Sequence, residues 1–222
     1  MRVAIQQPEH APWLGFFDKM KTCDLFVYLD NVQYKKRYFE NRNKIRVGDC
    51  FRWVTVPVVS KGRFSQKINE VEIDNSVKWQ QKYVGNVQAA YSKTSYFKKY
   101  FPDVEKVVNQ DYGLLLDLNL ALVDMVRRWA GIDTPCRLAS EILPETSVTG
   151  SELILALCEK VDATEYVSGP DGRNYLDLSA FESVSIGVDY HDYVHPEYEQ
   201  LHEGFESHMS VLDVFFNMGS LP

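Results

Sequence analysis

Arg2-Val3-Ala4-Ile5-Gln6-Gln7 is a short, mostly apolar run beside the N-terminus, and Asp24-Leu25-Phe26-Val27-Tyr28-Leu29-Asp30 is a second run of the same kind. Both are typical of strands, and the second is expected to be buried on both faces. Between them, residues 13–22 carry apolar side chains at helical spacing, which predicts a short helix. A strand, a helix and a strand with short connections predict a βαβ unit that contains a parallel strand pair.

Further strands and helices follow this unit along the chain. Strands are predicted over residues 51–59, 67–74, 164–168 and 184–190, with a hairpin or loop at 60–63. Helices are predicted over residues 77–92, 96–109, 114–130, 149–161 and 209–218, with an interruption at Pro102. Asn75-Ser76 predicts an N-cap for the first of these helices, and Thr149 with Glu152 predicts a capping box for the fourth. The sequence thus predicts an α/β fold with a small parallel or mixed sheet, an N-terminal βαβ unit flanked by helices, and a helical middle segment at 75–131.

The length and composition fit a single α/β domain over residues 1–222. Hydrophobic residues make up 45% of the chain and charged residues 25%, which are ordinary values for a folded globular protein. No apolar run approaches the roughly 20 residues that a bilayer-spanning helix needs. The N-terminus enters its first strand directly, without a signal-peptide pattern, so we expect a cytoplasmic protein with no membrane span.

The net charge of −7 conceals a basic segment. Residues 33–67 include ten basic side chains and two acidic ones, so the remainder of the chain is strongly acidic. Such a chain lacks the extended cationic face of a nucleic-acid-binding protein, and it fits a small anion such as a nucleotide or sugar phosphate. Lys36, Arg42 and Lys44 are candidate phosphate contacts. The alternative is a solvated basic surface that pairs with the acidic residues of 189–206.

Polar side chains at the ends of the first two strands are candidate ligand contacts. Gln6 and Gln7 end the first strand and Asp30 ends the second, and parallel strands place these ends at the same edge of a sheet. The glutamine amides can bind a ligand or satisfy backbone groups of the loop. Asp30 can accept a proton or hold a substrate amine, or it can form an ion pair with Arg42.

The sequence predicts no cofactor and no metal site. The four cysteines are widely spaced without a C-x-x-C pair, and the histidines do not fall with carboxylates at a metal-binding spacing. Ser168-Gly169-Pro170-Asp171-Gly172 lacks the glycine patterns of phosphate-binding loops and nucleophile elbows. Its glycines either allow close approach of a ligand or form a tight strand-to-helix turn. Tyr175 and His195 are candidate partners of the N-terminal loops.

Several motifs together resemble the WbqC-like protein family. They are Gln7-Pro8, Pro12-Trp13-x-Gly15-Phe16-Phe17-x-Lys19, Leu29-Asp30-x-Val32-Gln33-Tyr34, Lys36-Arg37, Asn41-Arg42-Asn43-Lys44-Ile45, Trp53-x-Thr55-Val56-Pro57, Ser168-Gly169-x-x-Gly172-x-x-Tyr175-Leu176, His195-Pro196-x-Tyr198 and Met209-Ser210-Val211-Leu212-Asp213. These motifs span nearly the whole chain, and the N-terminal ones are the most specific. Many members of the family carry histidine at the position of Gln6, so the resemblance implies no acid–base role for that residue.

The resemblance implies a bacterial enzyme of surface-polysaccharide biosynthesis, of the O-antigen type, in pathways that make modified amino sugars. A step suited to such pathways is transfer of an acyl or aminoacyl group to the amine of a nucleotide-linked sugar. The expected catalytic residues are Asp30 and His195. The expected substrate-binding residues are Gln6, Gln7, Gln33, Tyr34, Lys36, Asn41, Arg42, Asn43, Lys44, Ser168 and Tyr175. The alternative is a non-catalytic component of a biosynthetic assembly that binds a nucleotide sugar or carbohydrate.

Overall fold

The computed structural model describes all residues from Met1 to Pro222, and the chain divides into two compact units. The sheet unit consists of Met1–Gln7, Phe17–Asn31 and Asp133–Val194. The hairpin unit consists of Pro8–Phe16, Val32–Ile132 and His195–Pro222. Each unit is therefore assembled from three separate segments of the chain. The single domain over residues 1–222 stays a prediction.

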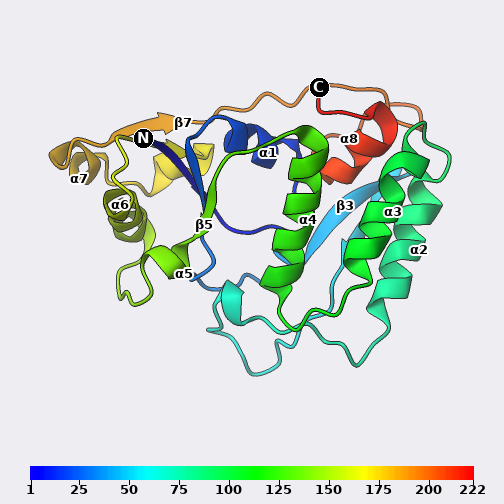
Figure 1. The fold of residues 1–222 in the computed structure, drawn as a ribbon, viewed down its shortest axis with the longest axis horizontal. Coiled ribbons are helices and arrows are strands. Elements are labelled where there is room, and N and C mark those ends of the chain that lie inside the picture. Colours follow the sequence, from blue (N-terminus) through cyan, green and yellow to red (C-terminus); the bar gives the residue numbers. More distant parts are fainter. The chain divides into compact units, whose positions relative to one another are not determined.

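Five parallel strands form the sheet of the sheet unit (Figure 1). They are β1 (Arg2–Gln6), β2 (Leu25–Tyr28), β5 (Cys136–Leu138), β6 (Glu165–Ser168) and β7 (Gly187–Tyr190). Their spatial order is β5-β2-β1-β6-β7, so the chain starts in the middle, builds one side and then returns to build the other. This is the order of a doubly wound sheet, in which ligands bind outside the carboxyl ends of the strands where the order reverses. Here the reversal lies between β1 and β6.

The predicted βαβ unit is confirmed. β1 pairs with β2 in parallel, with Val3 opposite Leu25 and Ile5 opposite Val27, and α1 (Leu14–Lys21) lies between these strands in the chain. All four residues of β2 are buried, as expected for a strand covered on both faces. The sheet unit also contains the helices α5 (Ala139–Ile142), α6 (Gly150–Lys160), η2 (Pro170–Asn174) and α7 (Leu178–Ser183). The α/β class predicted from the sequence is thus confirmed.

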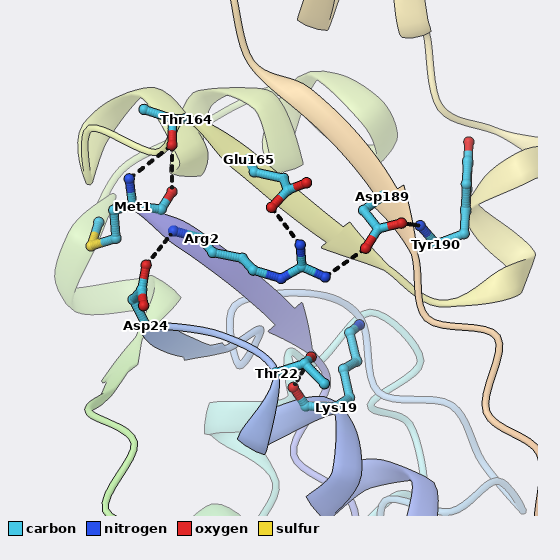
Figure 2. A network of polar contacts seen from close by, with 9 residues as sticks. All are labelled: Met1, Arg2, Lys19, Thr22, Asp24, Thr164, Glu165, Asp189 and Tyr190. Atoms are coloured by element: carbon cyan, nitrogen blue, oxygen red, sulfur yellow. Dashed lines mark hydrogen bonds and ion pairs between the residues drawn. The ribbon is translucent and has the colours of Figure 1, made fainter.

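Arg2 joins three strands of this sheet, as Figure 2 shows. Its guanidinium contacts the carboxylates of Glu165 in β6 and Asp189 in β7, each at 2.5 Å. Its backbone N–H donates to the carboxylate of Asp24, just before β2, at 2.7 Å. The hydrogen bonds to Asp189 and Glu165 raise the pKa of the guanidinium. Because a third or more of each of the three side chains is exposed, we expect these ion pairs to fix the strand register more than to add stability.

An antiparallel hairpin and several helices build the hairpin unit. β3 (Arg42–Val47) and β4 (Cys50–Thr55) pair around a tight turn at Gly48 and Asp49. The φ of Gly48 is 59°, a left-handed conformation that glycine adopts without strain. The helices are η1 (Ile68–Glu70), α2 (Trp79–Tyr91), α3 (Phe97–Val108), α4 (Leu115–Ala130) and α8 (Val211–Met218). α3 packs against α2, α4 and α8 (Figure 1).

Aromatic side chains fill the space between these helices. The ring of Phe216 on α8 lies 5.0 Å from that of Tyr91 on α2 and 5.5 Å from that of Phe97 on α3, between centroids. Phe215 packs on Tyr100 at 5.2 Å. All five side chains are buried, so the C-terminal helix is part of the core of the hairpin unit.

One predicted strand of the hairpin unit is wrong. Residues 67–74 form no continuous strand, because the Glu70 carboxylate accepts the Lys67 N–H at 2.8 Å and the chain turns there into η1. The neighbouring residues pair as strand only through isolated bridges, such as that between Val58 and Ile73. Of the two alternatives predicted for residues 60–63, the loop is confirmed, and the Arg63 N–H donates to the Ser60 carbonyl there at 3.3 Å. The hairpin of this unit turns at residues 48–49, because β4 pairs with β3, a strand that was not predicted.

The predicted helices are confirmed, while some of their predicted ends are not. α4 and α8 end at Gly131 and Gly219, both in the left-handed conformation of a glycine C-cap. α3 continues through Pro102 without the predicted interruption. None of the helices combines the length and the apolar character that crossing a membrane requires.

The predicted N-cap hydrogen bonds of α2 and α6 are not formed. The side chain of Asn75 accepts a hydrogen bond from the Trp79 indole at 3.1 Å and so does not cap α2, which begins at Trp79 without a side-chain cap. Thr149 occupies the N-cap position of α6, but its hydroxyl makes no capping hydrogen bond. The correct residue types are thus present near both helix starts without the capping geometry.

Candidate functional site

A polar side chain stands at or just after the carboxyl end of each parallel strand. These residues, which we call the sheet edge, are Gln6 at the end of β1, Asp30 after β2, Ser140 after β5, Ser168 at the end of β6 and His191 after β7. Parallel strands present their carboxyl ends at one edge of a sheet, so these five residues belong to the same edge. The sequence predicts Gln6, Asp30 and Ser168 as site residues, and it predicts neither Ser140 nor His191. Gln7, also predicted, follows β1 directly and is half-buried.

Ser140 holds the buried carboxylate of Asp30. Oδ1 accepts the Ser140 N–H at 2.9 Å, and Oδ2 accepts the Ser140 hydroxyl at 2.5 Å. Asp30 is fully buried, and these two bonds connect the loop after β2 to α5, the helix that directly follows the adjacent strand β5. The orientation of this carboxylate is therefore fixed before any ligand arrives.

Lys19 places a buried ammonium at the end of β1. Its Nζ donates to the carbonyl of Ile5 and to Oε1 of Gln6, each at 3.1 Å, and only 3% of the residue is exposed. Lys19 therefore determines which end of the Gln6 amide faces α1. The burial of Lys19 could be expected from its position in the sequence, because Lys19 follows the apolar Phe16 by three residues and so lies on the same buried face of α1.

The turn after β6 packs closely on Ser168. This residue is fully buried, and its hydroxyl donates to the carbonyl of Gly169 at 2.9 Å. A Cβ at Gly172 would lie 2.0 Å from the Ser168 hydroxyl oxygen, so this position requires glycine for a close approach within the turn. Tyr175 follows η2 with 52% of its surface exposed, and burial of its hydroxyl group raises its pKa, so the phenol is a hydrogen-bond donor at neutral pH.

His191 contacts a carboxylate that is far away in the sequence. Its Nε2 lies 2.7 Å from Oδ2 of Asp18 on α1, and 13% of the His191 side chain is exposed. Neither residue carries a local signal for this contact, because 173 residues separate them.

In the hairpin unit, His10 is the centre of a buried polar network. Its Nδ1 lies 2.9 Å from Oδ1 of Asn119, and its Nε2 lies 3.0 Å from the Tyr83 hydroxyl. The Asn119 amide nitrogen donates to the Glu40 carbonyl at 2.7 Å, which fixes the orientation of this amide. Asn119 Oδ1 is therefore an acceptor, so His10 carries its proton on Nδ1 and accepts the Tyr83 hydroxyl hydrogen at Nε2.

This network makes stability depend on pH. Burial lowers the pKa of His10 from 6.5 to about 4, and the unfolded chain regains a histidine pKa of about 6.5. Between these values the unfolded chain binds a proton that the folded chain does not, so stability present above pH 6.5 is lost as the pH falls towards 4. We expect this loss to be about 3 kcal/mol in urea unfolding. The His10→Gln variant should lack this contribution, and equal pH dependences for the two proteins would contradict it.

Asn43 holds the loop that contains His10. Its Nδ2 donates to the carbonyls of His10 at 3.1 Å and Ala11 at 2.9 Å, and its Oδ1 accepts the Lys44 N–H at 2.8 Å. Ala11 has a φ of 40°, so these bonds stabilise a left-handed residue that is not glycine. Both amide hydrogens of Asn43 are thus used within the hairpin unit. Its predicted contact to a substrate stays a prediction.

Three further predicted substrate contacts lie in the same unit. The Gln33 amide donates to the Phe64 carbonyl at 2.7 Å, and the Asn41 amide donates to the Val56 carbonyl at 2.8 Å. Tyr34 is buried, and this burial raises its pKa to about 12. The two amides therefore stabilise local backbone, and Tyr34 stays neutral at physiological pH.

The predicted phosphate contacts of the hairpin unit lie over aromatic rings. Lys36 Nζ lies 4.8 Å from the Phe64 ring centroid, Arg42 Cζ lies 4.0 Å from that of Trp53, and Lys44 Nζ lies 4.5 Å from that of Phe51. No ion pair joins residues 33–67 to the acidic residues of 197–206 in this unit, so the predicted alternative of acidic pairing is not found there. The cations are positioned by ring contacts and keep their positive charge available to an anion.

His195 lies among other rings of the hairpin unit. Its ring centroid is 5.0 Å from that of His208 and 6.1 Å from that of Trp13. His195 Nδ1 donates to the following carbonyl at 2.8 Å, so its Nε2 accepts the His208 N–H at 3.3 Å. Burial, followed by the neighbouring His195, lowers the pKa of His208. The catalytic role of His195 stays a prediction.

Comparison with known proteins supports one family for almost the entire chain. The model of the WbqC-like protein family matches residues 7–221. Uncharacterized protein Rv1507c of Mycobacterium tuberculosis is 37% identical over 221 residues, which cover 99% of this chain and 94% of that relative. No solved structure matches the chain.

Proposed function

This chain belongs to the WbqC-like protein family, which is associated with polysaccharide biosynthesis, and from that premise we propose that it is a transferase acting on a nucleotide-linked amino sugar. The reaction is transfer of an acyl or aminoacyl group to the amine of the sugar. The substrate is an anionic small molecule, and the proposal involves no cofactor, nucleic acid or membrane span.

The observation that carries this proposal is the doubly wound order of the parallel sheet together with the polar residues at its edge. The strand order reverses between β1 and β6, where Gln6, Gln7 and Ser168 stand. Sheets of this kind bind nucleotides outside the carboxyl ends of the strands at such a reversal. Tyr175 supplies a hydroxyl donor shortly after the same turn. We assign these residues to binding of the nucleotide sugar.

The proposed chemistry centres on Asp30. The sugar amine attacks the carbonyl carbon of the acyl donor, so that a C–N bond forms as the bond to the leaving group breaks, and the leaving group departs with the electron pair. Asp30 accepts the proton that the amine loses. Backbone N–H groups at the strand ends stabilise the negative charge that develops on the carbonyl oxygen.

The phosphate contacts proposed for Lys36, Arg42 and Lys44 rest on a separate observation. These side chains belong to the hairpin unit, and none of them pairs with a carboxylate there. An unneutralised cation adds affinity for a phosphate anion, and Arg42 has the planar guanidinium suited to two parallel contacts.

One observation favours the second candidate, a non-catalytic nucleotide-sugar-binding component. Both carboxylate oxygens of Asp30 already accept hydrogen bonds from Ser140. A carboxylate held in this way can orient an amine without accepting its proton. This candidate predicts ligand binding without turnover.

A screen of dTDP- and UDP-linked sugars by thermal shift, followed by assays with acyl and aminoacyl donors, tests the proposal. We expect the amino sugars to raise the melting temperature and to be acylated. Stabilisation without turnover would support the binding component instead. A purified, folded protein that no nucleotide sugar stabilises and that acylates none would contradict both candidates.

A further inference from the structure

Two tight turns of the hairpin unit are joined to each other at the surface. They are residues 35–38 and 60–64, which we call the paired turns. Each contains a backbone hydrogen bond between its first and fourth residues, at 3.4 Å and 3.3 Å. Lys36 Nζ in the first turn donates to the Ser60 carbonyl in the second at 3.1 Å. The Gln33 amide, just before the first turn, donates to the Phe64 carbonyl at 2.7 Å, so the two turns are held together.

Every charged side chain of the paired turns is positive. The turns contain no acidic residue and five basic residues, all of them exposed: Lys35, Lys36, Arg37, Lys61 and Arg63. Arg63 pairs with Glu72 at 2.9 Å, and the other four form no ion pair. Four cations are therefore not neutralised, although the whole chain has a net charge of −7. A negatively charged surface attracts the paired turns and repels the acidic remainder of the chain.

An exposed aromatic ring accompanies these cations on each turn. Phe64 is 76% exposed, more than any other large apolar residue of the hairpin unit, and Tyr38 is 45% exposed. Lys36 Nζ lies 4.8 Å from the Phe64 ring centroid, and Lys35 Nζ lies 5.3 Å from that of Tyr38. Single exposed apolar residues are common on protein surfaces, but here each ring is combined with an ammonium group. A partner that covers the rings therefore meets positive charge at the same place.

The surface of an anionic bilayer matches both features. It has phosphate groups at the water boundary and apolar chains directly beneath them, and aromatic rings are favoured at that depth. Single-stranded nucleic acid is also anionic, but it binds in grooves where successive bases stack on ring faces. Phe64 protrudes from its turn, and an ammonium lies over its ring. This geometry favours insertion into a bilayer over stacking.

We propose that the paired turns dock this chain on the surface of an anionic phospholipid bilayer. Phe64 enters the bilayer at the depth of the headgroups, and Tyr38 lies beside the headgroups. Lys35, Arg37 and Lys61 bind the lipid phosphates. Docking of this kind requires no membrane-spanning helix. The inference goes beyond the proposed function, because no nucleotide sugar takes part in it.

Sedimentation with lipid vesicles tests the docking. We expect the native protein to sediment with phosphatidylcholine vesicles that contain about 30% phosphatidylglycerol, and to stay in solution with vesicles of phosphatidylcholine alone. Raising the salt from about 0.1 M to about 0.5 M should release the protein, because salt screens the attraction between exposed charges. No sedimentation with the anionic vesicles, or equal sedimentation with the neutral ones, would overturn the proposal.

The Phe64→Ser variant tests the insertion. Loss of the ring should lower the affinity for the anionic vesicles at least about tenfold, and the melting temperature should stay the same because the ring is exposed. Val77→Ser, at a residue of the same unit that is 48% exposed, should bind like the native protein. Equal vesicle affinity of Phe64→Ser and native protein would refute the insertion. If Phe64→Ser weakened binding of a single-stranded DNA oligonucleotide more than binding of the vesicles, the surface would be a nucleic-acid site instead.

The double variant Lys35→Gln with Lys61→Gln tests the contribution of charge. Its affinity for the anionic vesicles should fall at least about tenfold, since each lysine near such a surface adds to the attraction. Lys93→Gln with Lys98→Gln removes the same charge at two other exposed positions and should leave the affinity unchanged. Equal losses in the two double variants would show that net charge alone acts, and would contradict a docking surface at the paired turns.

The proposed function and the docking can fail independently. Thermal shifts with nucleotide sugars should be the same in Phe64→Ser and native protein, because Phe64 has no part in the proposed nucleotide-sugar site. Lys36 is the one residue of the paired turns that is also assigned to phosphate binding in the proposed function, and neither variant changes it. Vesicle binding without stabilisation by nucleotide sugars would therefore contradict the proposed function and leave the docking supported.

Discussion

Replacing Asp30 with asparagine should lower the turnover number for sugar acylation by about 10²–10⁴-fold, the usual contribution of a general base. The nucleotide-sugar dissociation constant should change by less than about threefold, because the loss falls on the chemical step and not on ground-state binding. Asparagine preserves the packing of this buried position, and its Oδ1 can still accept the Ser140 N–H that Asp30 accepts at 2.9 Å. Steady-state kinetics and titration on the same protein sample measure both quantities.

The matched control for this variant is Asp24→Asn. Asp24 also accepts a backbone N–H, that of Arg2, but it stands before β2 at the amino edge of the same sheet and is exposed. This variant should retain native turnover. If Asp30→Asn kept more than about half of the native turnover number, Asp30 would not be the base, and the carboxylate would be a positioning group for α5, the helix that contains Ser140.

Replacing Asn119 with leucine should cause the largest loss of stability among single substitutions in the hairpin unit. Asn119 is fully buried, and leucine is close to it in size. The change removes the donor to the Glu40 carbonyl at 2.7 Å and the acceptor for His10 Nδ1–H at 2.9 Å. Each buried polar group left without a partner costs about 1–3 kcal/mol, so we expect a total loss of about 3 kcal/mol or more. Urea unfolding at neutral pH measures it.

Asn86→Leu is the control for this substitution. Asn86 lies on α2 and accepts only a long contact from Arg52 at 3.4 Å at the surface, so its replacement should change stability by less than about 0.5 kcal/mol. A loss below about 1 kcal/mol in Asn119→Leu would contradict the role given to the His10 network. The double variant with His10→Gln should lose less than the sum of the two single variants, because both act on the same hydrogen bond.

The sheet unit could be predicted where apolar residues run continuously. The runs at β1 and β2 predict a parallel pair, and the pairing of Ile5 with Val27 confirms it. β3 was not predicted, because one of its buried positions is the polar Asn43 and not an apolar residue like Ile45. The alternation of apolar and polar residues that identifies a strand is therefore lost in the sequence. Residues 67–74 were predicted as a strand for the opposite reason, since apolar side chains recur there although a local hydrogen bond turns the backbone into η1.

The sheet edge could be predicted only in part. Gln6, Asp30 and Ser168 stand out because each follows an apolar run that is recognisable as a strand. Ser140 follows β5, which has three residues and half-exposed side chains and therefore carries almost no strand signal. His191 could not be predicted, because its contact with Asp18 on α1 forms only in the folded chain.

Amide hydrogen exchange with and without a bound dTDP- or UDP-linked amino sugar tests the central claim most directly, because it locates the ligand in the native chain. The account predicts slower exchange at residues 6–7, 30–31, 139–141 and 168–172, which are the strand ends of the doubly wound sheet. Binding that leaves exchange at all four of these segments unchanged would contradict the assignment of the nucleotide-sugar site to the sheet edge.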